Sequence, residues 1–178
     1  DAPLEVRGCD HPWVSRGGIK LAHALDHFAL DPAGAVAMDI GSSTGGFTDV
    51  LLARGASEVV AVDVGYGQLV WRLQNDERVR VLDRTNIRKL TPEMMDGPAD
   101  LMVGDLSFIS LKLVLPALAE CMVDGADMLP MVKPQFEVGK DRLGSGGGRA
   151  GFARRPARRR GPDGARRAVA SGPHRGRR

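Results

Sequence analysis

The chain has 178 residues and a formal net charge of +3, which suits one domain of ordinary size. The positive charge is concentrated at one end, because residues 149–178 hold eleven arginines and one acid, whereas residues 1–148 hold 14 basic and 21 acidic side chains. The body therefore carries a formal charge of −7, which excludes a domain that binds nucleic acid through a broad basic surface.

The first predicted element is a helix. After an irregular lead-in at residues 1–13, apolar residues recur at helical spacing over residues 19–30. Five short apolar runs then predict buried strands, and the amphipathic segments between them predict helices. The predicted strands cover 35–40, 58–63, 79–82, 101–104 and 128–132, and the predicted helices between them cover 45–54, 67–75 and 110–122.

Strands and helices therefore alternate, which predicts an α/β fold with a parallel sheet, helices on both faces and right-handed crossovers. Two prolines conflict locally with this prediction. Pro116 lies inside a predicted helix, which it is expected to kink. Pro130 lies inside a strand expected to be central, where a proline removes a hydrogen bond of the ladder. The sequence offers no account of Pro130.

The composition changes after residue 139. Residues 144–178 contain no leucine or isoleucine, one valine and one phenylalanine, so we expect a disordered tail. Its arginine, glycine, alanine and proline could form a basic RNA-binding arm. The same mixture arises when a GC-rich gene is read in a shifted frame, and we favour that explanation. The expected organisation is a lead-in at 1–13, a domain at 14–143 that ends after the fifth strand, and the tail at 144–178.

The cysteines and the start of the chain further restrict the class of protein. Cys9 and Cys121 lack metal-ligand spacing, so we expect two reduced thiols and no metal. No apolar run approaches the roughly 20 residues that span a bilayer, and no signal peptide is recognisable. We therefore expect a cytoplasmic protein without membrane contact. Because the chain begins with Asp1 rather than methionine, we expect it to be a fragment of a longer protein.

The segment after the first strand is rich in glycine. It reads Asp-Ile-Gly-Ser-Ser-Thr-Gly-Gly-Phe over residues 39–47, so its spacing is G-x-x-x-G-G rather than the G-x-G-x-x-G of a dinucleotide site, and no P-loop lysine follows. Its glycines let the backbone approach a ligand at the strand ends, where open α/β sheets bind ligands. An acid before the first glycine, Asp39, suits a cation, and S-adenosylmethionine carries an ammonium and a sulfonium.

Asp63 closes the second strand, 22 residues after Gly41. A carboxylate at this point can accept hydrogen bonds from both hydroxyls of a ribose. The alternative is a plain glycine turn between strand and helix, with Asp63 as a helix cap. Acids at both strand ends, Asp39 and Asp63, favour the cofactor site over this alternative.

Three further segments fall at strand or helix ends on the same rim: residues 15–21 with Lys20, 104–110 with Asp105, and 132–137 with Lys133. Each lysine alone would be a solvated surface group. Two lysines and an aspartate that converge in one cleft would be costly to leave unpaired.

Together with residues 39–50 and 63–69, these segments resemble the TlyA/hemolysin A family of RNA methyltransferases, whose catalytic domain is similar to the FtsJ/RrmJ ribose methyltransferases. The resemblance covers roughly residues 13–147. It implies the Rossmann-like sheet of a class I S-adenosylmethionine-dependent methyltransferase. It also implies 2′-O-methylation of ribose in ribosomal RNA, typically at cytidine, with ribosomal RNA or ribosomal subunits as partners.

The resemblance also assigns roles to residues. Of the family's Lys-Asp-Lys-Glu tetrad, the first three members match Lys20, Asp105 and Lys133. Lys133 is the candidate that orients and deprotonates the ribose hydroxyl. The family's cofactor-binding positions match Asp39, Gly41, Ser43, Thr44, Gly45, Gly46, Phe47, Asp63 and Asp105, and the segment 83–86 that is expected near the adenine contributes Asn86.

The chain departs from the family in two ways. Nothing corresponds to the family's small N-terminal RNA-binding domain. The fourth tetrad member, a glutamate from a strand near the C-terminus, has no match, because the similarity fades after Gly147 and no glutamate follows. Glu137 belongs to a different motif and is not expected to replace it.

These departures leave a non-catalytic fragment of such an enzyme as the first alternative. A membrane-active lytic protein, which the family's historical name suggests, is disfavoured because the sequence has no basic amphipathic helix. A nicotinamide-dependent oxidoreductase is disfavoured by the glycine spacing.

Overall fold

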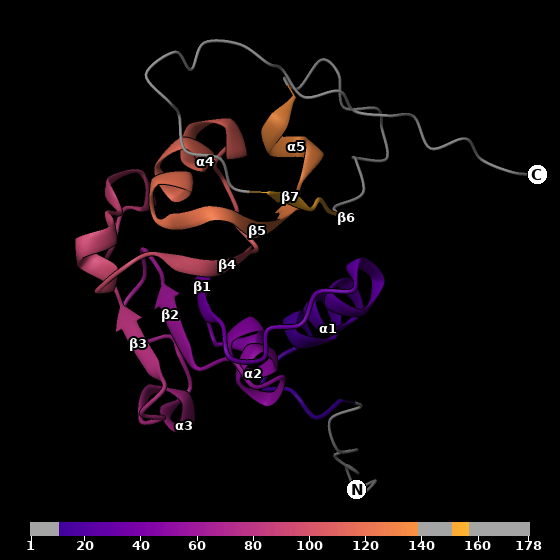
Figure 1. Cartoon of the computed structure of the whole chain (residues 1–178), viewed down its shortest axis with the longest axis vertical. Coiled ribbons are helices and arrows are strands. Elements are labelled where there is room, and N and C mark those ends of the chain that lie inside the picture. Colours follow the sequence, from indigo (N-terminus) through magenta and orange to yellow (C-terminus); the bar gives the residue numbers. More distant parts are fainter. Residues whose placement is uncertain (1–10, 139–150, 157–178) are drawn as a thin grey trace, which may run out of the picture.

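The computed structural model describes residues 11–138 and 151–156 (Figure 1). Five strands form a parallel sheet in the order β3-β2-β1-β4-β5, and two short strands pair with β5 in the antiparallel direction. The predicted α/β fold with a parallel sheet is confirmed. The parallel strands are Val36–Ile40 (β1), Glu58–Val62 (β2), Val79–Leu82 (β3), Ala99–Gly104 (β4) and Met122–Val132 (β5).

Helices cover both faces of the sheet. The helices Gly17–Phe28 (α1), Gly46–Ala53 (α2) and Trp71–Gln74 (α3) pack on one face. The other face is covered by Leu111–Glu120 (α4) and the 3-10 turns Ile87–Lys89 (η1) and Pro92–Met95 (η2). A last turn, Pro134–Glu137 (α5), follows β5. None of the helices in the described part of the chain has the length and apolar character of a membrane span.

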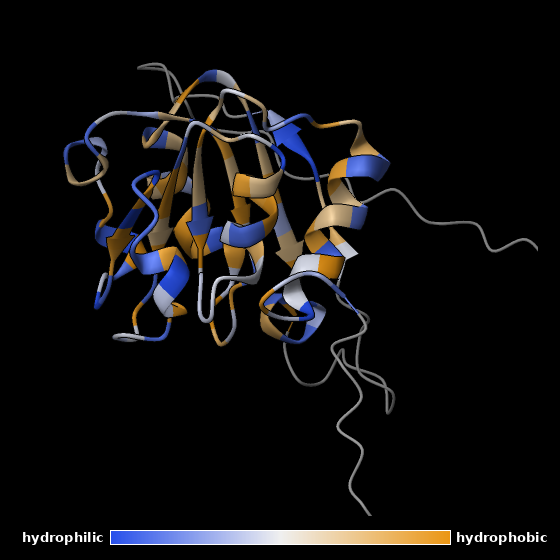
Figure 2. Cartoon of the chain, turned by 90° about the horizontal axis from the view of Figure 1, so that it is seen from below, coloured by the Kyte–Doolittle hydropathy of each residue, from blue (hydrophilic) through white to orange (hydrophobic). Residues whose placement is uncertain are grey.

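The core consists of two clusters, one on each side of the sheet, because alternate residues of a strand face opposite sides. In β1, Ala37 faces the α1 side, whereas Met38 and Ile40 face the α4 side, and all three are fully buried. Figure 2 shows the apolar colours on the strands and on the inward faces of the helices. Burial on both faces explains why the strands appear in the sequence as continuous apolar runs.

Each of the four predicted helices differs from its predicted bounds by at least one residue, and α1 and α3 do so for local reasons. Strand β5 begins at Met122, six residues before the predicted strand 128–132. Helix α1 ends at Phe28 because the next residue, Ala29, adopts a left-handed conformation with φ 50°. Helix α3 begins only at Trp71, since Gly67 has φ 63° and Val70 is extended. Helix α4 continues through Pro116, whose ring lies on the exposed face.

The position of Pro130 in β5 is compatible with the sheet. A strand residue directs its N–H and C=O toward the same neighbour. The C=O of Pro130 accepts a hydrogen bond from the N–H of Ala153 at 3.1 Å, so the position without an N–H faces the outer side of β5. The pairing of β5 with β4 therefore loses nothing at this residue, which resolves the conflict seen in the sequence.

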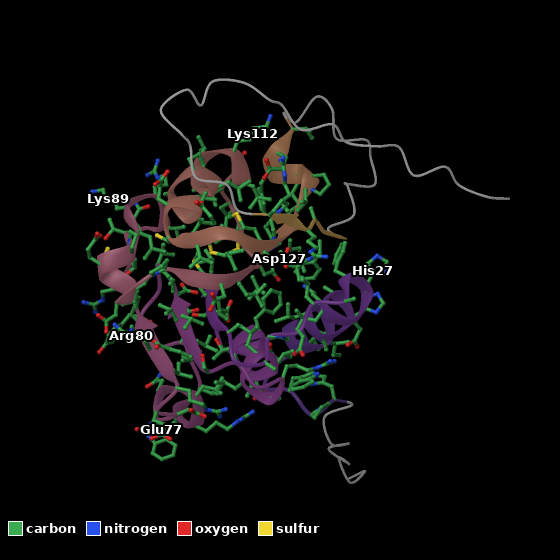
Figure 3. All side chains as sticks on the ribbon, in the orientation of Figure 1. His27, Glu77, Arg80, Lys89, Lys112 and Asp127 are labelled. Atoms are coloured by element: carbon green, nitrogen blue, oxygen red, sulfur yellow. The ribbon has the colours of Figure 1, made fainter. Side chains whose placement is uncertain are left out.

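The expectation that residues 144–178 have no stable fold is wrong for residues 151–156. Gly151–Phe152 (β6) and Arg155–Pro156 (β7) pair with β5. The guanidinium of Arg154 donates two hydrogen bonds to the carboxylate of Asp127, at 2.8 and 2.9 Å, and Figure 3 labels Asp127 beside these strands. The free edge of β5 offers backbone partners to a segment of any composition, which a composition argument does not capture.

Other predictions lie outside the described residues. These are the conformation of residues 1–10, of 144–150 and of 157–178, and with them Cys9 and the choice between a basic arm and a shifted frame. The predicted domain boundaries therefore stay a prediction.

We predict that Phe152→Ala lowers the free energy of unfolding by about 1–2 kcal/mol, less than the ~3–5 kcal/mol of a fully buried phenylalanine. The ring is half-buried and lies 5.8 Å from the ring of Phe47, so its removal takes apolar contacts from the core. Urea unfolding of the full chain measures the change. Arg155→Ala is the control, because its side chain is exposed and the backbone that pairs with β5 is kept in alanine. Equal stability of Phe152→Ala and the unchanged protein would show that the segment does not dock on β5.

Candidate active site

Two adjoining cavities open at the carboxyl ends of the parallel strands. The first has a volume of about 650 Å³ and the second of about 500 Å³. They share part of their walls, formed by Gly41, Ser43, Asp105 and Ser107. The segments that follow β1, β4 and β5 therefore converge, as expected for a parallel sheet.

Asp105 lies between the two lysines of the first cavity. Nζ of Lys133 is 2.5 Å from Oδ1 of Asp105, and Nζ of Lys20 is 3.5 Å from Oδ2. The side chain of Lys133 is 15% exposed and that of Lys20 is 52% exposed, so Lys133 belongs to the wall and Lys20 to the rim. The structure thus brings together the three residues that were predicted to form the catalytic group.

The fold fixes each of these residues. Asp105 directly follows β4, and its N–H donates to the C=O of Ile40 in β1 at 3.2 Å. Lys133 directly follows β5, whereas Lys20 reaches across from the first turns of α1. Because two of the three side chains come from neighbouring strand ends, the sheet register sets their separation.

Glu137 is engaged elsewhere. Its Oε2 accepts a hydrogen bond from the hydroxyl of Ser110 at 2.8 Å, and its Oε1 accepts one from the N–H of Leu111 at 2.7 Å. The carboxylate therefore caps the N-terminus of α4, where a negative charge is favourable. It does not line either cavity, which agrees with its exclusion from the tetrad.

The glycine-rich turn forms the floor between the cavities. Gly41 has φ 83°, and a Cβ atom at this position would lie 3.3 Å from the C=O oxygen of Asp105. Gly46 lies so close to the hydroxyl of Ser15 that any side chain would displace it. The other predicted cofactor residues of this turn that line the first cavity are Ser43, Thr44 and Phe47. Gly45 lies behind the wall, against the side chains of Leu69 and Leu73.

Asp39 is fully buried beneath this turn. Its Oδ2 accepts hydrogen bonds from the N–H and the hydroxyl of Thr48, at 2.9 and 2.7 Å, and its Oδ1 has no hydrogen-bond partner. Burial raises the pKa of Asp39 to about 7, and the negative charges of Asp63 and Asp105 act in the same direction, against the two bonds from Thr48. Because Asp39 lines neither cavity, we expect its charge to act on a ligand through the loop or a water rather than by direct contact.

The second cavity contains the predicted nucleoside residues Asp63 and Asn86. The two carboxylate oxygens of Asp63 each accept one backbone hydrogen bond at 2.8 Å, from Ser43 and from Gly65. These bonds fix the orientation of the carboxylate and leave lone pairs for further donors. The side chain of Asn86 accepts from the N–H of Arg88 at 3.1 Å and caps η1.

Three residues of the site were not assigned roles from the sequence. Asp49, a buried acid on α2, accepts from the N–H of Val14 and from Arg72, and so ties the lead-in and α3 to the turn. Ser107 accepts a hydrogen bond from Lys133 at 2.7 Å. Phe108 is 91% exposed at the mouth of the second cavity. An acid on an otherwise apolar helix face could have signalled Asp49, whereas nothing in the sequence singles out Ser107.

No group of three or more histidine, cysteine, aspartate or glutamate side chains gathers at metal-binding distance among residues 11–138 and 151–156.

Comparison with known proteins places this geometry in a family. The family model for an FtsJ-like methyltransferase matches residues 13–149. The chain is 61% identical over 142 residues to the 16S/23S rRNA (cytidine-2′-O)-methyltransferase TlyA of Mycobacterium tuberculosis, covering 80% of this chain and 53% of that protein. It is 49% identical over 148 residues to YqxC of Bacillus subtilis, named as a candidate rRNA methyltransferase, covering 83% and 53%.

A solved structure of a candidate hemolysin from Streptococcus thermophilus superimposes with a TM-score of 0.74 and 49% identity, over 79% of this chain and 51% of that one. The chain thus spans about half the length of the curated relatives it matches.

We predict that Asp39 makes the protein less stable as pH rises from 4 to 7. The unfolded carboxyl loses its proton near its usual pKa of 3.8, whereas the folded one holds it to about 7, so folding binds a proton in this window. The contribution of Asp39 to the free energy of unfolding is therefore fully present below pH 4 and is lost as the pH rises to 7. The loss is a few kcal/mol at most, since one pKa unit corresponds to about 1.4 kcal/mol.

Urea unfolding of the unchanged protein and of Asp39→Asn at pH 5 and pH 8 measures this effect. Asp39→Asn should remove most of the loss between the two pH values. Asp76→Asn should keep it, because hydrogen bonds from Arg78 lower the pKa of the half-buried Asp76 and place its titration below the window. Parallel curves for all three proteins would contradict the assignment.

Proposed function

The chain belongs to the FtsJ-like methyltransferase family, and we propose that it methylates the 2′-hydroxyl of a ribose, cytidine by analogy with TlyA, in ribosomal RNA, using S-adenosylmethionine. One observation carries the proposal: Asp105 holds Lys20 and Lys133 on the wall of a cavity that adjoins the glycine-rich turn.

The two cavities match the two ends of the proposed cofactor. The second cavity combines a fixed carboxylate, Asp63, with Asn86 and with the apolar side chains of Ile87 and Leu106, which suits a nucleoside with two ribose hydroxyls. The first cavity lies above the buried Asp39, whose unpartnered oxygen favours a cationic group nearby. When bound, S-adenosylmethionine supplies a methyl group that its sulfonium has already activated.

The chain's own residues would orient the hydroxyl and remove its proton. In its amine form, Lys133 can accept that proton, and Asp105 then stabilises the resulting ammonium at 2.5 Å. Lys20, more exposed, can bind the ribose or an adjacent phosphate at the rim. Holding the hydroxyl in line removes translational and rotational freedom, an effect worth up to about 7–11 kcal/mol.

Recognition of RNA by this domain would depend on few residues. Arg16 lines the first cavity, and Arg84 and Arg88 are exposed on the segment beyond the second, so phosphate contacts can form locally despite the acidic body. The ring of Phe108 is 91% exposed although it lies 5.3 Å from the ring of Phe136, so it still offers a flat apolar face to a base.

We predict that Lys133→Ala reduces methyl transfer by about 100-fold or more, since proton removal typically contributes about 10²–10⁴-fold. Cofactor affinity should be unchanged, because the cofactor residues lie on the turn and in the second cavity. Transfer of labelled methyl groups to ribosomal subunits and calorimetry with S-adenosylmethionine measure the two effects. Lys112→Ala, at the surface of α4 (Figure 3), is the control. Undiminished transfer by Lys133→Ala would remove this residue from the mechanism.

We predict the opposite pattern for Asp63→Ala. Loss of an acceptor for the ribose hydroxyls should weaken cofactor binding on the order of tenfold or more in calorimetry, as expected for lost hydrogen bonds to a charged group. Asp100→Ala is the matched control, because Asp100 also accepts a backbone N–H, from Val36 at 2.9 Å, but lies near the amino end of β4 and lines neither cavity. Equal affinities for the two variants would contradict the role of Asp63.

The alternative, a non-catalytic fragment, is supported by one observation: among residues 11–138 and 151–156, no glutamate lines the first cavity. Thermal unfolding with and without S-adenosylmethionine, together with the methyl-transfer assay, distinguishes the active enzyme from the non-catalytic fragment. A rise in the unfolding temperature without methyl transfer identifies a cofactor-binding fragment, and no rise contradicts the cofactor assignment itself.

A further inference from the structure

Three successive contacts join the loop after β4 to the segment after β5. The hydroxyl of Ser107 accepts from Lys133, the ring of Phe108 lies 5.3 Å from the ring of Phe136, and Glu137 accepts from Ser110 and from the N–H of Leu111. We name residues 107–111 and 133–137 the loop–helix clasp. Its contacts follow one another in the same order along both segments, so the loop and the helix α5 support each other.

Within the clasp, Ser107 contacts the side-chain nitrogen of Lys133. Nζ of Lys133 donates to Oγ of Ser107 at 2.7 Å. Oδ1 of Asp105 forms an ion pair with the same Nζ at 2.5 Å. Nζ is therefore held at two points, by the carboxylate of Asp105 and by the hydroxyl of Ser107.

The position of Ser107 gives this bond a consequence for the site. Ser107, Asp105 and Lys133 all line the first cavity. Nζ has three substituent positions besides its carbon, and one of them is directed at Ser107 while Asp105 stands beside another. The remaining position is left for the cavity, where in the amine form it holds the lone pair that accepts a proton.

We propose that Ser107 is a positioning residue that directs the amine of Lys133 toward the substrate hydroxyl. This proposal rests on the proposed function. Asp105 alone leaves Nζ free to rotate about its contact with the carboxylate. A second contact, to the hydroxyl of Ser107, restricts that rotation before the substrate binds.

The test follows the ammonium of Lys133 by ¹⁵N NMR of the full chain, which contains only five lysines. In the unchanged protein its protons should exchange with water about tenfold more slowly than those of the exposed Lys112, as expected when one charged hydrogen bond must open first. Ser107→Ala should make exchange at Lys133 several-fold faster than in the unchanged protein, although the ion pair with Asp105 remains, and Ser107→Thr, which keeps the hydroxyl, should restore the slow rate.

Ser110→Ala is the matched control, because it removes a neighbouring loop hydroxyl that bonds to Glu137 rather than to Lys133. It should lower the unfolding temperature and leave the exchange at Lys133 slow, whereas a merely structural role for Ser107 would make the two alanine variants alike. Slow exchange at Lys133 in Ser107→Ala would overturn the proposal.

A second arm measures methyl transfer to ribosomal subunits. Ser107→Ala should lower kcat about tenfold, with an unchanged KM for S-adenosylmethionine, and Ser107→Thr should recover most of the rate. An unchanged kcat would overturn the proposal even if the exchange rates behaved as expected. If the unchanged chain neither binds S-adenosylmethionine nor methylates, the proposed function fails, and the exchange experiment still decides whether Ser107 orients Lys133.

Discussion

The site depends on one carboxylate held between two ammonium groups. Asp105 can occupy this place because β4 pairs with β1 on one side and with β5 on the other, so its position is set by two ladders at once. Lys133 directly follows the neighbouring strand β5, and Lys20 approaches from α1 across the rim. Without Asp105 the two positively charged lysines would repel each other in a partly enclosed cavity, and nothing would hold them together there.

The sequence was sufficient for those parts that follow from strand ends. Continuous apolar runs locate buried parallel strands, and a parallel sheet collects whatever follows its strands at one edge. The convergence of Asp105, Lys133 and the turn around Gly41 could therefore be predicted without coordinates. The length of α3 could not, because its first predicted turn is undone by a left-handed Gly67 and by Val70, which is extended and donates its N–H to the turn at Thr44.

The remaining features were beyond a sequence argument because they join residues far apart in the chain by polar contacts. Asp49 meets Val14 across 35 positions, and Ser107 meets Lys133 across 26. Neither contact produces a periodic pattern in the sequence, and a single serine in a loop or aspartate in a helix is too common to indicate one. Strands β6 and β7 were not predicted for a related reason. Backbone pairing with the edge of β5 and an ion pair at Asp127 do not require an apolar segment.

The three acids in and beneath the site differ in how their negative charges are compensated, and this difference indicates the kind of ligand. Asp105 has two lysines, and Asp63 has two backbone N–H groups. Asp39 has only Thr48, is fully buried, and feels the other two charges, which is why its pKa rises to about 7. A neutral ligand over the turn would leave the negative charge of Asp39 uncompensated, and an anionic ligand would add a further negative charge beside it. A ligand whose cationic end lies over Asp39 would compensate that charge, so the electrostatics favour a sulfonium or ammonium there over a phosphate.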